Sequence, residues 1–260
     1  MYFETHAHYT SDAYKDDLDQ VINRTTKAGV SHLVNIASDL KSNQQAIDLA
    51  HKHHFMYATV GIHPIYSNDV QKSDLDHIRS LTSADKVVAL GEIGLDYHHP
   101  NSPHEVQQWW FENQLDLAKE VGLPIIIHCR DAHEPTFETL KKAAMPIRHG
   151  MAAGISHCFS GSVEMAKKYV EMGYLIGIGG VVTFKNAKKL VEVVEEIPLE
   201  YLVIETDAPY LSPEPHRGQR NDSSYLPHIV EKIAQIKQLS HEEVAKATFK
   251  TAQRFFGLTQ

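Results

Sequence analysis

Two histidines stand one residue apart near the start of the chain, in the stretch FETHAHY at residues 3 to 9. Alternate side chains of an extended strand share a face, so the imidazoles of His6 and His8 are expected to point the same way. Imidazole is the commonest metal ligand among protein side chains. This short motif therefore predicts a place where a metal ion binds.

Histidines and carboxylates also end several other apolar runs of the sequence. One such ending is compatible with a satisfied core residue, but unpaired charges are costly to bury. Repeated endings therefore predict one metal site to which several strands contribute. The predicted ligands are His6, His8, Glu92, His128, His157 and Asp207.

This ligand set indicates two metal ions rather than one. A single catalytic zinc ion needs about three protein ligands, whereas a carboxylate can bridge two cations about 3.5 to 4 Å apart in a hydrolytic centre. We expect Glu92 to be the bridge. We expect Asp207 to orient a water molecule and accept its proton. Glu92 and Asp207 are thus the predicted catalytic residues, with two divalent ions per subunit.

The elements that must position these residues alternate along the chain. Short apolar, β-branched runs are followed by stretches with helical spacing, such as residues 104–122. Strands alternating with helices imply a parallel sheet, and eight such units in about 250 residues predict an α/β fold, a (β/α)8 barrel of TIM type. The predicted strands are residues 1–3, 32–37, 56–61, 86–94, 124–129, 154–159, 174–180 and 201–207.

A barrel of this type carries its catalytic residues at the C-terminal ends of the strands. The first and eighth strands are neighbours once the barrel closes, so His6, His8 and Asp207 are expected to hold one ion. His128 and His157, from neighbouring strands, are expected to hold the other. We interpret residues 1–260 as a single domain with its active site at this rim.

Composition limits the partners of the protein. The chain has 260 residues, a net charge of −8 with histidine neutral, and two cysteines. Proteins that wrap duplex DNA need a basic surface, so extensive nucleic-acid binding is disfavoured, but a small phosphate-accepting pocket is not. No apolar run approaches the roughly 18 residues of a membrane span, and few cysteines fit a reducing compartment. We expect a cytoplasmic protein without a membrane contact or an obligate protein partner.

Several motifs follow one another from end to end of the chain: HAH, GIHP, GEIGLDY, IHCRDA, HCFSGS, GIGGVVTFKNA, and ETDAPYLSP followed by HRGQRN. Together they resemble the TatD family of metal-dependent deoxyribonucleases, within the wider amidohydrolase-like metal hydrolases. The resemblance implies a (β/α)8 barrel whose divalent metal centre hydrolyses phosphodiester bonds, often as a 3′-to-5′ exonuclease. Matched position by position, it places the metal ligands on the same six residues.

The expected substrate is a DNA end or another phosphoester, and four residues are predicted to contact it. Arg130 shares the face of His128, where its guanidinium could grip a phosphate. His63 in GIHP is a further candidate. Arg217 and Asn221 resemble the phosphate-side residues of the family.

Two acidic residues are predicted to lie behind the ligands. Glu205 precedes Asp207 by two residues and shares its face. Glu4 stands where the family usually has aspartate, and its extra methylene is expected to shift a hydrogen bond to a ligand.

Two alternative functions remain open at this point. The first is an amidohydrolase that acts on C–N bonds of a small molecule, but many such enzymes carry a carboxylated lysine where this chain has Glu92. The second is a non-catalytic metal-binding protein, for which a broken ligand set is expected. The identity of the metal also stays open among Zn, Mn, Fe, Ni and Mg.

Overall fold

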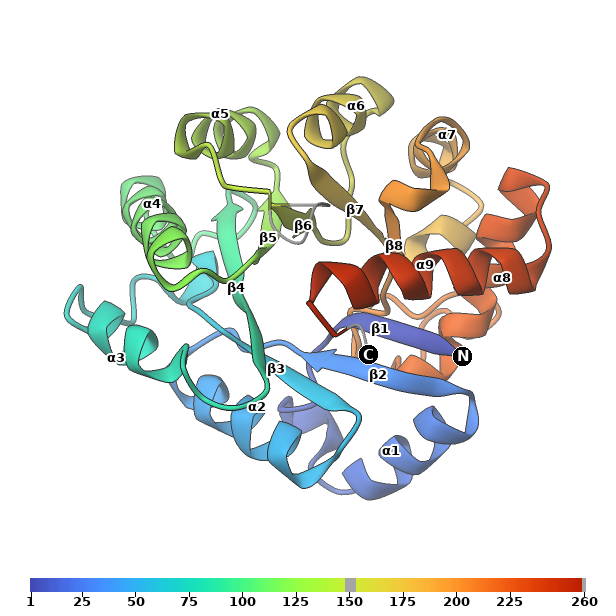
Figure 1. Ribbon diagram of the computed structural model, residues 1–260, viewed down its shortest axis with the longest axis horizontal. Helices are drawn as coiled ribbons and strands as arrows, with labels where there is room; N and C mark the ends of the chain where they lie inside the picture. The colour runs from blue at the N-terminus through green and yellow to red at the C-terminus, as the bar shows by residue number, and fades with distance from the viewer. Residues whose placement is uncertain (148–152, 259–260) are drawn as a thin grey trace.

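The computed structural model describes residues 1–147 and 153–258, in which a ring of eight parallel strands is surrounded by helices (Figure 1). Each strand pairs with the next one along the chain. The strands are β1 (Tyr2–Ala7), β2 (Val30–Asn35), β3 (Met56–Val60), β4 (Val87–Asp96), β5 (Ile125–Arg130), β6 (Gly154–Ser156), β7 (Tyr174–Ile178) and β8 (Leu202–Ile204). The predicted (β/α)8 barrel is confirmed.

Helices follow the strands and form the outer layer. They are α1 (Leu18–Lys27), α2 (Leu40–Lys52), α3 (Asp74–Leu81), α4 (His104–Val121), α5 (His133–Ala143), α6 (Val163–Glu171), α7 (Lys188–Glu196), α8 (Leu226–Lys237) and α9 (His241–Phe255). Short 3-10 turns lie between the strands and helices: η1 (Asp12–Tyr14), η2 (Pro64–Tyr66), η3 (Gly180–Thr183), η4 (Leu199–Tyr201) and η5 (Ser223–Tyr225). None of the described helices is long and apolar enough to cross a membrane.

The barrel closes between β1 and the segment that follows β8. The backbone N–H of Asp207 donates to the carbonyl of His6 at 2.9 Å, and the N–H of His8 donates to the carbonyl of Ala208 at 2.7 Å. The expected neighbourhood of the first and eighth strands is therefore present. It places the start and the end of the predicted ligand set side by side.

The strands are buried on both faces, which explains their continuous apolar sequences. In β5, Ile125 and Ile127 join the larger apolar cluster beneath the helices, whereas Ile126 joins a smaller cluster with Phe255 at the end of α9 and Phe256 just after it. Helix α9 packs on β1 and β8 and lies across the barrel (Figure 1). One end of the barrel is thereby filled with apolar side chains, and the opposite end is left for polar ones.

One helical pattern of the sequence is divided in the structure. Residues 13–29 read as a continuous amphipathic stretch, but η1 occupies residues 12–14 and α1 begins only at Leu18. The reason is the buried ring of Tyr14, whose hydroxyl donates to the carbonyl of Asn221 at 2.6 Å. This contact ties the loop after β1 to the loop after β8.

Candidate metal centre

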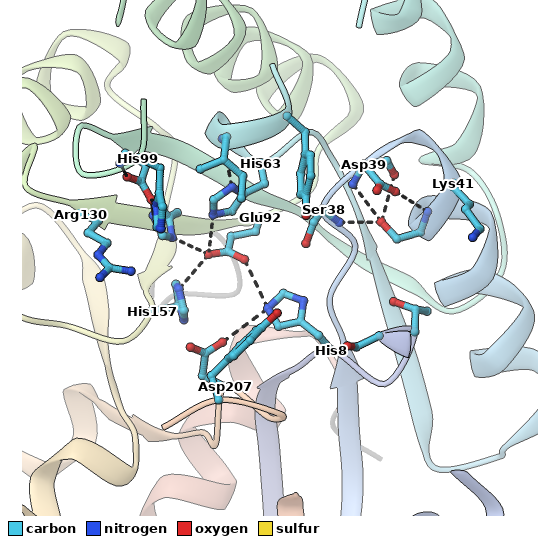
Figure 2. A pocket seen from close by; sticks show the side chains of 18 of the residues that line it. His8, Ser38, Asp39, Lys41, His63, Glu92, His99, Arg130, His157 and Asp207 are labelled. Carbon is cyan, nitrogen blue, oxygen red and sulfur yellow. Dashed lines mark hydrogen bonds and ion pairs between the residues drawn. The ribbon is translucent and has the colours of Figure 1, made fainter. Parts of the chain in front are cut away.

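The six predicted ligands meet at the end of the barrel where the strands terminate. Their positions are His6 on β1, His8 just after it, Glu92 on β4, His128 on β5, His157 just after β6 and Asp207 shortly after β8. All except His6 line a cavity of about 670 Å³, and the imidazole of His6 is fully buried beneath it. Figure 2 shows Glu92 in the middle of this group.

The carboxylate of Glu92 faces imidazoles on two sides. Its Oε1 lies 2.8 Å from His128 Nδ1 and 2.8 Å from His157 Nε2. Its Oε2 lies 3.5 Å from His6 Nε2 and 3.6 Å from His8 Nε2. One carboxylate thus reaches two sets of imidazoles with different oxygens, which is the arrangement that a bridging ligand requires.

The first set consists of His6 and His8 together with Asp207. The Nε2 atoms of the two histidines are 3.1 Å apart, and Asp207 Oδ1 lies 3.6 Å from the former and 3.4 Å from the latter. The other ring nitrogen of His8 lies 3.2 Å from the carbonyl oxygen of Ile36, which turns Nε2 toward Asp207. The expected grouping of these three residues is what the structure shows.

The second set contains His63 in addition to the expected pair of His128 and His157, which both lie 2.8 Å from Glu92 Oε1. His63 Nε2 lies 3.6 Å from Glu92 Oε1, and His63, Glu92 and His128 offer ligand atoms within 4.8 Å of one another. His63 was expected to contact the substrate, yet it lies among the candidate ligands. Its Nδ1 accepts a hydrogen bond from the Ile65 N–H at 3.2 Å, so Nε2 is directed toward the carboxylate.

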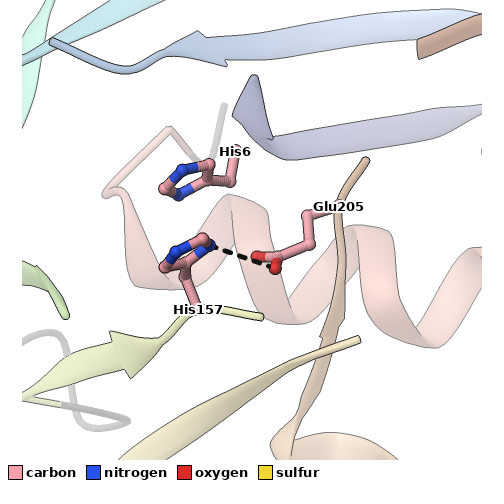
Figure 3. Close-up of side chains that lie close together, drawn as sticks. All are labelled: His6, His157 and Glu205. Carbon is pink, nitrogen blue, oxygen red and sulfur yellow. Dashed lines mark ion pairs between the residues drawn. The ribbon is translucent and has the colours of Figure 1, made fainter. Parts of the chain in front are cut away.

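His157 also lies against His6. Their rings are stacked with 3.7 Å between centroids, and Glu205 Oε1 lies 3.3 Å from His157 Nδ1 (Figure 3). The same oxygen accepts a hydrogen bond from the Cys158 N–H at 2.5 Å. Glu205 is therefore placed behind the ligand His157, as predicted from its spacing to Asp207, although it supports a different ligand.

Glu4 supports a ligand through the backbone. Its fully buried carboxylate accepts hydrogen bonds from the N–H of His6 at 3.1 Å and from the N–H and hydroxyl of Thr206. Burial raises the pKa of Glu4 to about 8 despite these hydrogen bonds. The longer side chain thus fixes the strand that carries His6 and makes no contact with the imidazole ring itself.

Two further residues of the site, Asp96 and His99, were not predicted from the sequence. Asp96 Oδ2 lies 3.0 Å from His128 Nε2 and 2.9 Å from His99 Nδ1, and its side chain is almost completely buried. A signal for Asp96 exists in GEIGLDY, because a residue four positions after Glu92 shares its face of β4. His128 therefore lies between two carboxylates.

The charges of the centre depend on one another. Burial alone raises the pKa of Glu92, but the surrounding imidazoles of His157, His63 and His6 hold it well below its ordinary value. Burial and the neighbouring His128 lower the pKa of His63 to about 3, so this imidazole is neutral. A neutral imidazole beside an ionised carboxylate is the form in which both groups bind a metal.

The donor set fits divalent cations. Imidazole and carboxylate ligands suit Zn, Mn, Fe and Ni. The Nε2 atoms of His6 and His8 lie 3.1 Å apart, and both face carboxylate oxygens of Glu92 and Asp207. A cation between imidazoles and carboxylates would satisfy nitrogens that the protein leaves without a suitable partner.

The remaining predicted contacts lie in different places. Arg130 lines the cavity beside the centre (Figure 2). Arg217 lies over the ring of Phe184, 4.2 Å from its centroid, outside the residues that line this cavity. Asn221 is fully buried and donates to the carbonyls of Thr206 and Tyr210. The side chain of Asn221 therefore holds the loop after β8 in this structure and does not line the cavity.

A (β/α)8 barrel with histidines and carboxylates gathered at the C-terminal ends of its strands defines a metal-dependent hydrolase. The sequence model of the TatD related DNase family matches residues 3–257. The chain belongs to this family, which confirms the resemblance seen in its motifs and the predicted class of enzyme.

Similar proteins extend over nearly the whole chain. The metal-dependent hydrolase YabD of Bacillus subtilis is 44% identical over 256 residues, which cover 98% of this chain and 99% of YabD. The 3′-5′ ssDNA/RNA exonuclease TatD of Erwinia amylovora is 34% identical and covers 98% of this chain and 100% of its own length. Among solved structures, the TatD homologue YjjV of Escherichia coli K12 superimposes with a TM-score of 0.93 at 30% identity, with 99% and 98% of the two chains covered.

Proposed function

We propose that this chain is a 3′-to-5′ exonuclease that removes nucleotides from single-stranded DNA with two divalent metal ions per subunit. The observation that carries the proposal is the position of Glu92, whose two oxygens face separate sets of imidazoles. Relatives named as 3′-5′ ssDNA/RNA exonucleases support the reaction and its direction.

Bound ions would supply Lewis-acid chemistry, activating water and offsetting charge on the phosphate. His6, His8 and Asp207 would hold one ion, and His63, His128 and His157 the other, with Glu92 shared between them. His157 also adjoins the first set, since it stacks on His6.

Asp207 is the residue that can accept a proton during hydrolysis. Burial raises its pKa, but the contact with His8 and the nearby His157 and His6 bring the pKa below its ordinary value, so the group is a carboxylate at neutral pH. In the proposed reaction the oxygen of a water molecule bonds to phosphorus, the water proton passes to Asp207, and the bond from phosphorus to the 3′ oxygen breaks. That oxygen takes a proton from solvent.

The cavity favours a strand end over a continuous duplex. Its volume of about 670 Å³ is that of a small-molecule pocket, and the chain carries a net charge of −8. Arg130 and Lys41 are the cationic side chains of its lining and lie on opposite sides of Glu92 (Figure 2). One positively charged side chain on each side of the centre suits the phosphates of a single strand.

The cavity argues against hydrolysis of C–N bonds by the amidohydrolase route. A carboxylated lysine would have to come from the fourth strand, where Glu92 stands. Lys41, the lysine of the cavity lining, belongs to the start of α2.

We also propose a cytoplasmic location, because Cys129 and Cys158 are free thiols as expected in a reducing compartment.

The test is hydrolysis of 5′-labelled single-stranded DNA by metal-stripped protein supplied with Mg, Mn or Zn. We expect stepwise shortening from the 3′ end, reduced at least about 100-fold in Glu92→Ala and Asp207→Asn. Glu171→Ala, an exposed acid at the end of α6, is the matched control and should retain full activity. Absence of cleavage by wild type with every metal would overturn DNA as the substrate.

A further inference from the structure

An exposed aromatic ring stands on a fixed backbone at the mouth of the cavity. The side chain of Tyr210 is 59% exposed. Its N–H donates to the carbonyl of Asp207 at 2.9 Å, and its carbonyl accepts from Asn221 Nδ2 at 2.5 Å. The buried Asn221 thus holds in place a large ring that itself has little protein cover. Exposed aromatic surface at a binding site is a common mark of ligand contact.

A second tyrosine faces the same cavity from the loop after β3. Tyr66 ends the turn η2, where its N–H donates to the carbonyl of His63 at 3.0 Å. The ring of Tyr66 lies 6.2 Å from the ring of His63, and the ring of Tyr210 lies 6.4 Å from the ring of His8. Each tyrosine therefore stands beside a different set of candidate metal ligands, one on either side of Glu92.

The two tyrosines adjoin a part of the cavity that has short polar side chains. We call this part the polar lobe, and its residues are Thr10, Ser11, Ser38, Asp39, Ser42 and Gln45. Burial, Asp39 and Tyr210 all raise the pKa of Tyr66, which agrees with both tyrosines facing this lobe. In Figure 2, Ser38 and Asp39 lie on the side of Glu92 that is opposite to Arg130.

The chemistry of this region matches a nucleoside. Every base has an apolar face that stacks on an aromatic ring whatever the sequence. Hydroxyl and amide side chains of the polar lobe can bond the 3′ hydroxyl of the sugar and the base edge. Arg130, on the far side of Glu92, is then left for the phosphates of the remaining strand.

We propose, building on the exonuclease function above, that Tyr66 and Tyr210 receive the base of the 3′-terminal nucleotide by stacking while the polar lobe holds its sugar. The presence of a base at the 3′ end then contributes to binding, whereas the identity of that base does not. Removal of the last nucleotide should therefore depend on the presence of a base at that position.

Three 5′-labelled single strands test this inference with the metal-loaded enzyme, through initial rates measured over a range of strand concentrations. The first has a normal 3′ end, the second has an abasic tetrahydrofuran residue as its 3′-terminal unit, and the third carries that residue ten units inside the strand. Stacking on an aromatic side chain changes affinity for a base by about tenfold. We expect wild type to remove the terminal abasic unit with a kcat/KM about tenfold lower, and to treat the first and third strands alike.

The variants separate stacking from general damage. Tyr210→Ala and Tyr66→Leu should lose most of the difference between normal and abasic ends, mainly through a higher KM for the normal end. Tyr210→Phe and Tyr66→Phe keep a ring and should retain the difference. Leucine is chosen at position 66 because the half-buried tyrosine also packs against the core, and Tyr210→Ala removes a ring with little cover, so that one of the two variants should fold normally.

The outcomes distinguish this inference from the function on which it rests. Wild type that removes normal and abasic ends equally well, or tyrosine variants that lose activity on both ends by the same factor, would overturn the stacking role alone. Wild type that cleaves neither end would overturn the exonuclease function and the stacking role together.

Discussion

The imidazole rings of His6 and His157 lie face to face, with 3.7 Å between their centroids and 8° between their planes, although one belongs to β1 and the other follows β6. Two protonated rings at this distance would repel each other. Burial lowers the pKa of His6, and His157 lowers it further. The carboxylates of Glu92 and Glu205 raise the pKa of His157 well above its ordinary value, against the effect of burial. Burial and the stacked His157 thus both favour the neutral form of His6, and Glu205 contacts its partner.

Replacing Glu205 tests whether it positions His157. Glutamine keeps the shape of the side chain but removes the negative charge that lies 3.3 Å from His157 Nδ1. Loss of such a partner behind a metal ligand weakens metal binding by about 10- to 100-fold. We therefore expect Glu205→Gln to bind Mn²⁺ more weakly in calorimetric titrations, while the control Glu171→Gln binds like wild type. Equal affinities in all three proteins would contradict this role.

A glycine makes room for Glu205. A Cβ atom at Gly177 would lie 2.6 Å from Glu205 Oε2 and 3.0 Å from the Cα of His157, whereas one at Gly179 would meet nothing nearer than 3.7 Å. Gly177→Ala should therefore lower the free energy of unfolding by about 1 to 3 kcal/mol, since inserted atoms force packed groups apart. It should also weaken metal binding, because His157 and Glu205 are the groups displaced.

The matched control for this change is Gly179→Ala, on the same segment of chain. Its effect on stability should stay within about 0.5 kcal/mol. Urea unfolding of the metal-free proteins measures both values. A similar loss in the two variants would mean that the crowding at Gly177 is not the cause.

The sequence was sufficient for the barrel and for most of the centre, because both depend on spacing. A run such as PIIIHC places His128 at the end of a buried strand whatever its surroundings. Spacing also indicates Asp96, because its side chain lies on the same face of β4 as that of Glu92. The proximity of His8 and Asp207 also followed from closure of the barrel alone.

Side-chain directions in the loops depend on contacts between distant segments, which spacing does not reveal. His157 shares Glu92 Oε1 with His128, but its other nitrogen faces Glu205 of the segment after β8, which the spacing of the two histidines does not reveal. Asn221 turns inward because Thr206 and Tyr210 present carbonyls to its amide. No pattern in the local sequence distinguishes such a residue from one that faces the substrate.

A half-buried histidine far from the centre predicts a dependence of stability on pH. His32 on β2 is stacked on Phe3, with 5.1 Å between ring centroids, and lies edge-on to Phe249 at 5.2 Å. Burial lowers its pKa below the unfolded value of about 6.5. The unfolded chain then binds a proton more readily, so the stability that His32 contributes is present above pH 6.5 and is lost as the pH falls toward the folded pKa.

Replacing His32 with phenylalanine keeps a ring in the stack but removes the titrating group. Between pH 7 and 5.5, the Tm of metal-free His32→Phe should therefore fall less than the Tm of wild type. His77→Gln, a change at an exposed position of α3, should follow wild type across this range. Identical slopes for wild type and His32→Phe would exclude His32 as a source of acid sensitivity.

Metal removal should destabilise the whole barrel, because the candidate ligands come from β1, β4, β5 and the segments that follow β3, β6 and β8. An ion that binds only the folded state at 100 times its Kd adds about 2.7 kcal/mol. For a chain of this size that corresponds to a rise in Tm of about 5 to 10 °C. Calorimetric scans of wild type with Mn²⁺ and with a chelator measure this difference.

Glu92→Gln decides whether the rise in Tm comes from the proposed centre. The substitution keeps the size of the side chain but removes the charge that both imidazole sets share. The variant should therefore show a much smaller difference in Tm between metal and chelator, and fewer bound ions by elemental analysis than the two per chain expected of wild type. If Glu92→Gln instead retained both ions and the full rise in Tm, Glu92 would not be the bridge, and the imidazoles would have to hold the ions without it.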